Sequence, residues 1–381
     1  MSYNLQPFRL DFQYGYLNEK GEIAIKPRFT NANHFDKDET AIVCLGSKYG
    51  VIDKKGEWVI EPIFCSLYGF KNGFAIASIN FLNYGVINKY GEWVIEPKFS
   101  SIQDLDKNTI MAASTECFGN KGLIDIQGKW ILKPSFKSIG AFKQGLAAVE
   151  LNGKYGFINE KGEIVIELRF ENALYFSDNG LAQVMIGKKW GFIDISGNVV
   201  IEPKYKDAKH FMPNGFAAVK TENRWGFVDK NGKIVVEPKF DEVYYDDCDS
   251  FMLIKSNNKY GYMDKNMNIV IEPRFKEAGI FNDRGLASVE ISKKCGLINR
   301  KGEWVIEPIF DKIYPFFGSY KLTEACIKKH AVFINEQGEI ILKIKNMHGK
   351  KILKNAGGEM IYKEPSDKPS VDFLYKNMIN A

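Results

Sequence analysis

Short runs of β-prone residues alternate with polar, glycine-containing turns along most of the chain. Two such runs flank residues 159–162, Asn-Glu-Lys-Gly, and a polar loop that ends in glycine is typical of a hairpin turn with a left-handed last residue. In most copies we expect the second run to end at a Glu-Pro pair, because proline cannot donate to a strand ladder. A further apolar run follows a loop, as at residues 145–150, so each unit is predicted to hold three strands.

This hairpin recurs on a nearly fixed spacing. A glycine that usually follows an aromatic residue, here called the anchor glycine, repeats at steps of 35, 35, 37, 34, 35, 35, 35 and 35 residues. The nine anchor glycines are Gly15, Gly50, Gly85, Gly122, Gly156, Gly191, Gly226, Gly261 and Gly296. A tenth, degenerate copy has Val332 at this position. Such a period is the sequence signature of a tandem-repeat architecture.

Other positions are fixed relative to the anchor glycine. A second glycine follows six residues later, except at Met267, and a proline follows twelve residues later, except at Leu168. Fourteen residues later every copy has phenylalanine or tyrosine, and most copies have a phenylalanine after twenty. We expect these two aromatic positions to form a stacked core, and the anchor glycine to allow a neighbouring ring or backbone to approach closely.

A three-stranded unit of this length buries little apolar surface by itself, so its stability must come from stacking on its neighbours. Propellers usually have roughly four to eight blades of four strands. Ten units of three strands therefore favour an all-β open superhelix or solenoid, with a closed propeller-like ring as the alternative. Residues 1–13 are predicted to add a capping strand, residues 14–343 to form the array, and residues 344–381 to form a C-terminal cap and tail that includes a hairpin over 354–362.

Composition agrees with a β-rich globular chain. The 381 residues include 34 glycines and 28 phenylalanines, which disfavours a helical bundle, and the 26% of charged residues with a net charge of +5 disfavours disorder. No apolar run reaches the ~18 residues of a membrane-spanning helix, and we expect no membrane insertion. Six cysteines without Cys-x-x-Cys spacing are typical of reduced thiols, so a cytoplasmic protein is expected.

Two copies carry the residues of a known family. Residues 189–205 contain Lys-Trp-Gly-Phe-Ile-Asp, a glycine turn and Val-Val-Ile-Glu-Pro-Lys-Tyr, and residues 224–240 repeat the pattern. This pattern resembles the bacterial WG-repeat family, also called KWG repeats, over roughly residues 14–343. The resemblance implies tandem β-rich repeats without catalytic residues. Most copies replace the tryptophan by tyrosine, and others have Lys121, Cys295 or Ala331, so this position requires bulk more than an indole nitrogen.

Signatures of catalysis are missing from the sequence, which contains no nucleophile elbow, no His-Glu-x-x-His, no P-loop and no dinucleotide-binding glycine motif. His34 and His210 share a position nineteen residues after the anchor, where Gly69 and Pro315 stand in other copies, so we interpret them as loop histidines. The four histidines are too widely spaced for a metal-ligand cluster. We therefore expect a non-enzymatic protein without cofactor or metal.

Two recurrent features of the repeat, its charged positions and its tryptophan position, are candidates for a binding surface. A glutamate and, two residues later, a lysine or arginine recur in most units, and we interpret them as a solvated ladder of opposite charges. Because the 52 basic and 47 acidic residues are intermingled, no unit carries the basic patch that phosphate binding requires, and a nucleic acid or nucleoprotein partner is only the second alternative. A tryptophan position eight residues after the anchor is aliphatic in other copies, which favours burial; carbohydrate or cell-wall binding is the first alternative. The tryptophans at this position are Trp58, Trp93, Trp130 and Trp304.

The most unusual loop, residues 243–250, is the candidate partner-binding site. It replaces the usual loop of the seventh unit, and its tyrosines and aspartates could contact a basic partner, although a solvated loop without function is the alternative. The candidate residues are Tyr244, Tyr245, Asp246, Asp247 and Asp249. These features predict a monomeric, non-catalytic scaffold that binds a macromolecule, and another protein is the expected partner.

Overall fold

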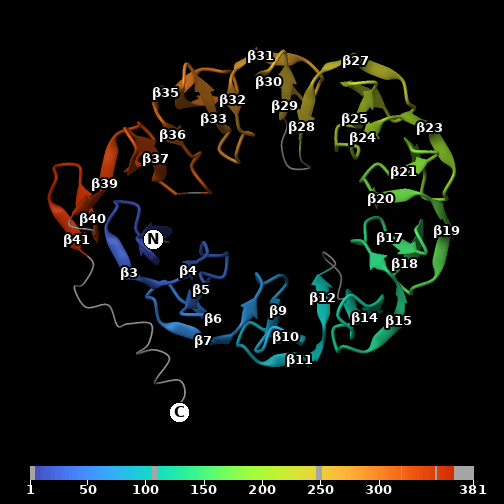
Figure 1. Cartoon of the computed structure of the whole chain (residues 1–381), viewed down its shortest axis with the longest axis horizontal. Helices are drawn as coiled ribbons and strands as arrows, with labels where there is room; N and C mark the ends of the chain where they lie inside the picture. The colour runs from blue at the N-terminus through green and yellow to red at the C-terminus, as the bar shows by residue number, and fades with distance from the viewer. Residues whose placement is uncertain (1–4, 105–109, 246–250, 319, 348–349, 364–381) are drawn as a thin grey trace.

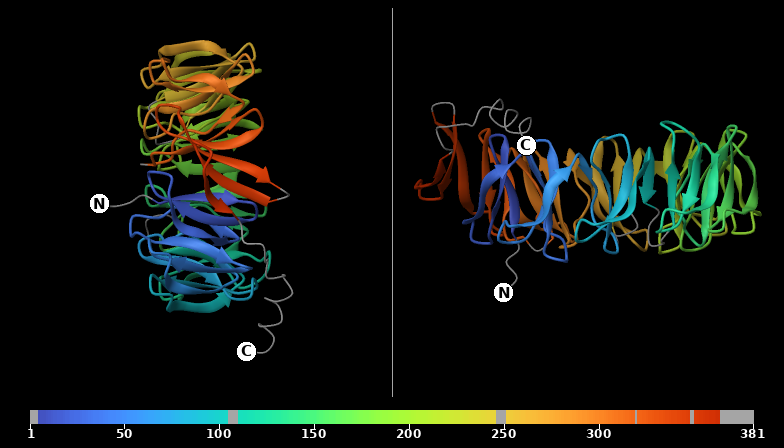
Figure 2. Two further views of the ribbon diagram at one scale, coloured as in Figure 1. Left: turned by 90° about the vertical axis from the view of Figure 1, so that its left-hand side faces the viewer. Right: turned by 90° about the horizontal axis from the view of Figure 1, so that it is seen from below.

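The computed structural model describes residues 5–104, 110–245, 251–318, 320–347 and 350–363, and every regular element in these ranges is a β-strand. Ten antiparallel sheets stand as blades around a closed ring, and the first blade lies beside the last (Figure 1). Edge-on views show the ring as a flat band with connecting loops at both edges (Figure 2). The protein is therefore a ten-bladed β-propeller. The closed ring was the alternative expectation, and the open superhelix is wrong.

Blades 2–9 each have four strands whose order follows the chain, from a short innermost strand to the outer edge of the ring (Figure 1). The innermost strands are β4 (Asn31–Ala32), β8 (Ser66–Leu67), β12 (Ser101–Asp104), β16 (Ser138–Ile139), β20 (Asn172–Phe176), β24 (Asp207–Ala208), β28 (Glu242–Tyr244) and β32 (Glu277–Ala278). The second strands are β5 (Ala41–Leu45), β9 (Phe74–Ser78), β13 (Met111–Ser114), β17 (Leu146–Leu151), β21 (Ala182–Ile186), β25 (Phe216–Thr221), β29 (Phe251–Ser256) and β33 (Leu286–Ile291).

The third strands of these blades carry the anchor glycines, and the fourth strands form the outer edge. The third strands are β6 (Lys48–Ile52), β10 (Tyr84–Asn88), β14 (Lys121–Ile124), β18 (Lys154–Asn159), β22 (Lys189–Ile193), β26 (Arg224–Asp229), β30 (Lys259–Asp264) and β34 (Lys294–Asn299). The outer strands are β7 (Trp58–Phe64), β11 (Trp93–Phe99), β15 (Trp130–Phe136), β19 (Ile164–Phe170), β23 (Val199–Tyr205), β27 (Ile234–Phe240), β31 (Ile269–Phe275) and β35 (Trp304–Phe310).

The end blades depart from this pattern. Blade 1 has three strands, β1 (Gln6–Leu10), β2 (Gln13–Leu17) and β3 (Ile23–Phe29). Blade 10 has six strands, β36 (Lys312–Ile313), β37 (Thr323–Ile327), β38 (His330–Ile334), β39 (Ile340–Met347), β40 (Lys350–Asn355) and β41 (Met360–Lys363). The strand expected before residue 14 is β1, and the hairpin expected near residues 354–362 is β40–β41, which projects outward from the ring (Figure 1).

The blade boundary differs from the boundary of the repeat unit. The predicted third strand of a unit pairs with the hairpin of the following unit, as β17 pairs with β18. The strand missing from the predicted unit is the innermost one, which in most blades has only two residues, as in β16, and such a short segment has no hydrophobic period that a sequence pattern could reveal. The expected count of three strands per unit is therefore too low by one.

Two families of loops now define the two faces of the ring. We call the face with the connections between second and third strands the tip face, and the opposite face, with the connections between third and fourth strands, the turn face. The ten tips are residues 11–12, 46–47, 79–83, 115–120, 152–153, 187–188, 222–223, 257–258, 292–293 and 328–329. The ten turns contain the glycines that follow the anchors by six residues, or Met267 in their place.

The anchor glycine is required by the outer strand of its own blade. At Gly191, an added Cβ would lie 2.4 Å from the carbonyl oxygen of Ile201, far inside van der Waals contact. The register between β22 and β23 shifts there, and β23 continues through Pro203 to Tyr205. The strand therefore does not end at the Glu-Pro pair as expected, because an irregular edge strand tolerates a proline that has no N–H to donate.

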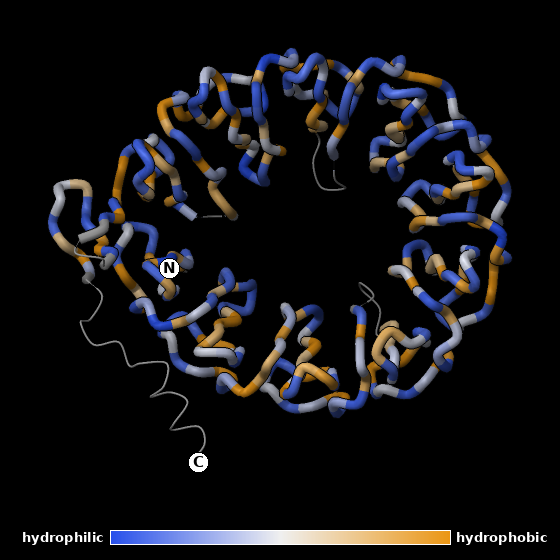
Figure 3. The backbone as a smooth tube through the Cα atoms, in the orientation of Figure 1, coloured by the Kyte–Doolittle hydropathy of each residue, from blue (hydrophilic) through white to orange (hydrophobic). Residues whose placement is uncertain are grey.

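The hydrophobic core lies between neighbouring blades. Phe170 of blade 5 and Phe176 of blade 6 are buried in one cluster, and the rings of Phe157 and Phe176 are 4.8 Å apart. The turn glycine Gly197, with φ at +85°, lets its blade approach Ile166 of the preceding blade. The predicted aromatic core is thus confirmed, and apolar segments recur in every blade around the ring (Figure 3).

Three arginines that directly precede a core aromatic residue bridge neighbouring blades. Arg169 donates a 2.6 Å hydrogen bond to the carbonyl of Gly197 in the next blade, and its guanidinium lies 5.0 Å from the ring centre of Phe170. Arg28 and Arg274 make the same bond to the turn glycine 28 residues further along. Within the described residues, no base at this position forms an ion pair with the glutamate two residues before it. At these three arginines, the base therefore bonds to the next blade and forms no ion pair with the glutamate of its own strand.

Candidate partner-binding site

Tyr245, one of the residues expected to bind a partner, instead ties two blades together. Its hydroxyl donates to the carbonyl of His210 at 2.8 Å and accepts from the backbone N–H of Ala218 at 3.1 Å. Its half-buried ring packs beside the core of blades 7 and 8. Tyr244 is 43% exposed, and its hydrogen bond to the carboxylate of Glu242 raises the pKa of Tyr244 to about 12. Asp246, Asp247 and Asp249 lie outside the described residues.

Both loop histidines also make contacts between blades. The ring of His34 stacks on Phe317, and its Nδ1 lies 3.0 Å from the hydroxyl of Tyr320. Burial lowers the pKa of His34. His210 packs against the rings of Tyr175 and Tyr245. The interpretation of these histidines as loop residues omitted their role in joining blades.

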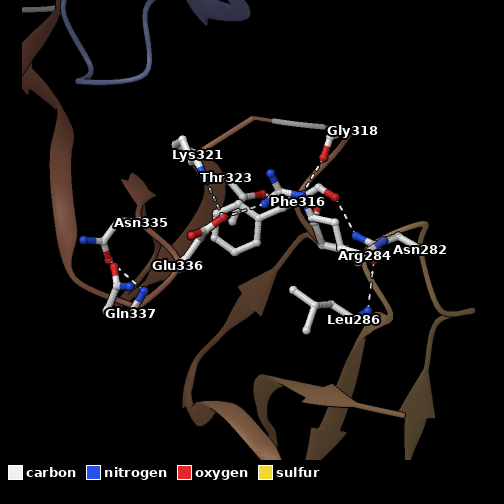
Figure 4. A network of polar contacts seen from close by, with 11 residues as sticks. Asn282, Arg284, Leu286, Phe316, Gly318, Lys321, Thr323, Asn335, Glu336 and Gln337 are labelled. Atoms are coloured by element: carbon white, nitrogen blue, oxygen red, sulfur yellow. Dashed lines mark hydrogen bonds and ion pairs between the residues drawn. The ribbon is translucent and has the colours of Figure 1, made fainter. Parts of the chain in front are cut away.

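A polar network supports the loop that carries Phe317 and Tyr320. The guanidinium of Arg284 in blade 9 forms an ion pair with Glu336 at 2.8 Å and donates to the carbonyl of Gly318 at 2.5 Å (Figure 4). The side-chain amide of Asn282 donates to the carbonyl of Phe316 at 2.5 Å. Because Arg284 reaches both the loop and the turn of blade 10, it holds this loop in place next to the ring closure.

A hollow lies between blades 3 and 4, and we call it the blade 3–4 cavity. Its volume is about 510 Å³. It is lined by the loop between β8 and β9, by β9 and β10 of blade 3, and by β12, β13 and the turn of blade 4. Apolar residues dominate the lining and include Phe70, Phe74, Val86, Ile102, Met111 and Ile126. A cavity of this size accommodates one large apolar side chain or a small molecule.

Two repeat positions that form a blade interface elsewhere carry smaller residues in blades 3 and 4. In blades 5 and 6, Phe157 follows the anchor glycine and contacts Phe176 across the blade interface. The corresponding residue in blade 3 is the small Val86, and the phenylalanine position twenty residues after Gly85 falls on Leu105, which lies outside the described residues. The series of phenylalanines twenty residues after the anchors is interrupted at Leu105 and at Asp246, and the first interruption is a sequence signal next to this blade interface.

Polar groups stand at the edge of the cavity. Lys71, Asn72 and Gln103 are among the residues that line it, together with the exposed Tyr68. The amide oxygen of Gln103 accepts a hydrogen bond from the ammonium of Lys121 at 3.1 Å. The backbone of Asn72 is held at a φ of 51° in a tight loop. A mostly apolar lining with a few amide groups suits the binding of an apolar side chain of a peptide.

The tryptophans expected to be buried pack against the cores. Each ring meets the core phenylalanine of the preceding blade edge to face, with centroids 5.5 to 6.3 Å apart, as Trp93 meets Phe64. The supporting argument from aliphatic replacements fails, however, because Ile164, Val199 and Ile234 are exposed at this position. The tryptophans are half-buried, so the expected burial is only partly met, and they contact the neighbouring phenylalanine because their side chains are long enough to reach it.

Other possible chemistry is sparse in the described ranges. They contain no group of three or more His, Cys, Asp or Glu side chains placed to hold a metal ion. The five described cysteines are free. None of the described segments is a helix of the length and apolarity needed to cross a membrane.

Fold and site together define a β-propeller whose most distinctive feature is a cavity between two blades. The family model described as WG containing repeat matches nine tandem segments: residues 14–49, 49–80, 84–113, 122–155, 155–190, 190–225, 225–260, 260–295 and 296–320. The chain therefore belongs to the WG containing repeat family.

Among solved structures, the chain is similar to one titled as the eukaryotic initiation factor, with 10% identity and a TM-score of 0.51 over 80% of this chain and 95% of the other. It is also similar to the dihydro-heme d1 dehydrogenase NirN, with 12% identity and a TM-score of 0.40 over 68% of this chain and 70% of the other. BamB from Moraxella catarrhalis has 13% identity and a TM-score of 0.36 over 68% and 94%. The sequence matches no curated protein. At these identities, the first likeness describes the fold alone.

Proposed function

We propose that this protein is a non-catalytic β-propeller scaffold that binds another protein, and that the blade 3–4 cavity receives an apolar side chain of the partner. The observation that carries the proposal is the cavity of about 510 Å³ with its apolar interior. Pockets that accept an anchor side chain at a protein interface combine such an interior with a few oriented polar groups. The side chains of Asn72 and Gln103 supply these groups at the edge.

The partner segment is expected to be extended rather than helical. Its anchor residue would enter between Val86 and Met111, while its backbone amides meet the polar edge of the cavity. An aromatic or leucine anchor would restore the packing that Phe157 and Phe176 provide between blades 5 and 6. The partner thus completes a blade interface that the chain leaves incomplete.

The test replaces a residue that lines the cavity by a larger one, so that the new side chain fills the cavity. Val86→Phe introduces the residue type that blade 5 uses at this position, and Val94→Phe makes the same change at an exposed site on the outer strand of blade 3. Tagged wild-type protein should retain a protein from native lysate, and Val86→Phe should reduce the recovery of that protein by about tenfold or more, a loss of at least about 1.4 kcal/mol. Val94→Phe should leave its recovery unchanged.

Titration of the purified partner then gives the dissociation constant for each variant. If Val86→Phe melts like the wild type and retains every protein that the wild type retains, the cavity is not the binding site. Changing Tyr244 to alanine tests the remaining exposed part of the loop 243–250 separately, and we expect no effect on recovery.

A further inference from the structure

Two hairpin tips on the tip face are larger than the other eight. The other tips have two residues, whereas blades 3 and 4 have tips over residues 79–83 and 115–120. In blade 4 the extra residues account for the anchor step of 37 between Gly85 and Gly122. In blade 3, Ser66 pairs with Ser78, one residue closer in sequence than the equivalent pair of Asn172 and Met185 in blade 6, so the step stays at 35 and the sequence spacing does not reveal the larger tip.

Each enlarged tip holds a phenylalanine out toward solvent. Phe81 is 62% exposed and Phe118 is fully exposed. Both have a φ of 62°, in the left-handed region that bulky residues rarely adopt. Two neighbouring apolar side chains, Leu82 and Ile79, are 72% and 45% exposed. Strained positions held by the surrounding structure are found preferentially at functional sites.

Polar side chains fix the backbone of both tips. The side-chain oxygen of Asn80 accepts hydrogen bonds from the backbone N–H groups of Leu82 and Asn83, at 3.0 and 2.9 Å. In blade 4, the hydroxyls of Ser100 and Ser114 both donate to the carbonyl of Glu116, at 2.7 and 2.9 Å. The exposed phenylalanines are therefore presented by ordered tips, because each tip has hydrogen bonds that a random loop lacks.

The remaining tips of this face are basic. Counting each tip with the residue that follows it, the ten segments contain eleven basic side chains and three acidic ones. The basic residues are Lys48, Lys121, Lys154, Lys188, Lys189, Arg224, Lys259, Lys293, Lys294, Lys328 and Lys329. The acidic residues are Asp11, Glu116 and Glu222. Most of these basic side chains are exposed.

The charge of the tips is not cancelled by the other loops of this face. The residues that directly follow the outer strands of blades 1–9 add three lysines, Lys137, Lys206 and Lys276, and three acids, Glu171, Asp241 and Asp311. Two of those acids pair with tip bases, as Lys294 contacts Asp311 at 2.5 Å and Arg224 contacts Asp241. On the turn face, the ten five-residue turns contain fourteen acidic and eleven basic residues, so the ring is electrically polar.

We propose that the tip face adsorbs to an anionic lipid surface, with Phe81, Leu82 and Phe118 entering the interfacial layer and the basic tips contacting the headgroups. Aromatic and leucine side chains favour the membrane–water interface, and clustered lysines are attracted to anionic lipids. A flat surface can contact tips of many blades at once, which matches basic residues spread over blades 2 and 4–10. Aliphatic Ile79 and Leu82 offer no ring on which a base could stack, so the tips suit lipid better than nucleic acid.

This proposal goes beyond the binding of a protein partner, because it uses the face of the ring opposite the turns that border the blade 3–4 cavity. It describes adsorption, with no chain segment crossing the bilayer. The interaction should weaken with salt, because the exposed basic tips act through screened Coulomb attraction.

The experiment is sedimentation of the full chain with vesicles of phosphatidylcholine alone, or of phosphatidylcholine with phosphatidylglycerol. We expect binding to the anionic vesicles only, and a decrease as salt is raised from about 50 to about 300 mM. Phe81→Asn with Phe118→Asn should lower the partition coefficient about tenfold or more; asparagine tolerates the left-handed backbone, so the tips should stay folded. A variant that combines Lys188→Glu, Lys189→Glu, Lys328→Glu and Lys329→Glu should no longer bind the anionic vesicles.

Tyr90→Asn is the matched control, because Tyr90 is an exposed aromatic residue of blade 3 on the turn face. It should bind vesicles like the wild type. Absence of binding to anionic vesicles, equal binding to neutral vesicles, or full binding by the Phe81 and Phe118 double variant would each overturn the proposal. If the tip face binds RNA or a protein and does not bind vesicles, its partner is that RNA or protein, and the lipid proposal is wrong. Val86→Phe changes the blade 3–4 cavity and leaves the tips unchanged, so it should bind vesicles like the wild type. The cavity proposal and the lipid proposal can therefore fail independently.

Discussion

The imidazole ring of His34 stacks on the ring of Phe317, with centroids 4.2 Å apart and an interplanar angle of 18°. His34 belongs to the loop after β4 in blade 2, and Phe317 belongs to the loop after β36 in blade 10. The two loops meet across blade 1, which has only three strands and lacks the short innermost one. The ring is thus closed on its inner side by side chains that stand in for a missing strand.

We predict that Phe317→Ala weakens the closure of the ring. Loss of the stacked ring should lower the free energy of unfolding by about 1 kcal/mol, the usual contribution of an aromatic pair beyond its buried area. Hydrogen exchange should show the loss of protection first in blades 1, 2 and 10. Phe118→Ala removes an exposed ring that makes no such stack, and it should leave exchange in these blades unchanged.

Stability should also fall with acidification through His34. Burial lowers the pKa of His34 in the folded protein, so folding favours the neutral imidazole. This contribution is fully present above the unfolded-state pKa of about 6.5 and is lost as pH falls through the lower folded-state pKa. Because the side chain is partly exposed, the effect should be small. Thermal melts between pH 7 and pH 5 should show a smaller decrease for His34→Gln than for the wild type; an equal decrease would contradict this assignment.

The anchor glycines should tolerate no side chain. Gly191→Ala places a Cβ 2.4 Å from the carbonyl oxygen of Ile201, so the outer strand β23 must move. We expect destabilisation of at least about 3 kcal/mol, measured by urea unfolding. Gly187 lies at a tip with open space around it and has a φ of 58°. Gly187→Ala should therefore lower the free energy of unfolding by only about 1 kcal/mol, the cost of placing alanine in the left-handed conformation. Similar losses at both positions would mean that the close approach is not what fixes Gly191.

The arginine that bridges blades should matter more than lysines at the same repeat position. Arg169→Met removes the hydrogen bond to the carbonyl of Gly197 and should cost about 1 kcal/mol, because the site is partly solvated. Lys204→Met, one unit later, removes a side chain for which no such bond is found in the described structure, and it should change stability by less than about 0.5 kcal/mol. Calorimetric melting temperatures of the two variants give the comparison.

Two tyrosines should respond oppositely to loss of the hydroxyl. The buried hydroxyl of Tyr205 has no hydrogen-bond partner among the described residues, and the other eight copies with an anchor glycine have phenylalanine there. Tyr205→Phe should therefore be neutral or stabilising by about 1 kcal/mol. Tyr245→Phe loses bonds to His210 and Ala218 and should destabilise by about 1 kcal/mol or more. Destabilisation of both variants in urea would imply a partner for Tyr205.

Local features were predictable because each is set by neighbours in sequence. The turn glycines, the aromatic residues that follow the anchors by fourteen, and the strand before residue 14 could all be identified from spacing, since a fixed period repeats the same local geometry in every copy. The candidate site was less predictable. The sequence predicted that Tyr245 binds a partner, because the loop around it is unusual. Its hydroxyl instead donates to the carbonyl of His210, 35 residues earlier, and only the packing of two blades brings these residues together.

The enlarged tip of blade 3 shows how a regular spacing can hide a difference. Ala77 pairs with Gly85, one residue further along than in blade 6, where Val184 pairs with Gly191, whereas Ser66 pairs with Ser78, one residue closer than Asn172 with Met185 in blade 6, so the anchor step remains 35. In blade 4 the anchor step of 37 is visible in the sequence, but the step alone does not say which loop of the unit contains the extra residues. Only the strand pairing of β13 with β14 places the extra residues at the tip.

By itself, the sequence determined a ten-fold array of β units, the residues of its core and the need for glycine at each anchor, because these depend on contacts within one unit or between adjacent units. Only the tertiary structure decided that the array closes. Closure depends on the sum of small rotations between blades, and each rotation is set by how side chains fill the space between two sheets. At the junction, Gly21 of the first blade packs against Ile341 of the last in the way each turn glycine packs on the blade before it. No local pattern records that sum, which is why ring and superhelix have the same sequence signature.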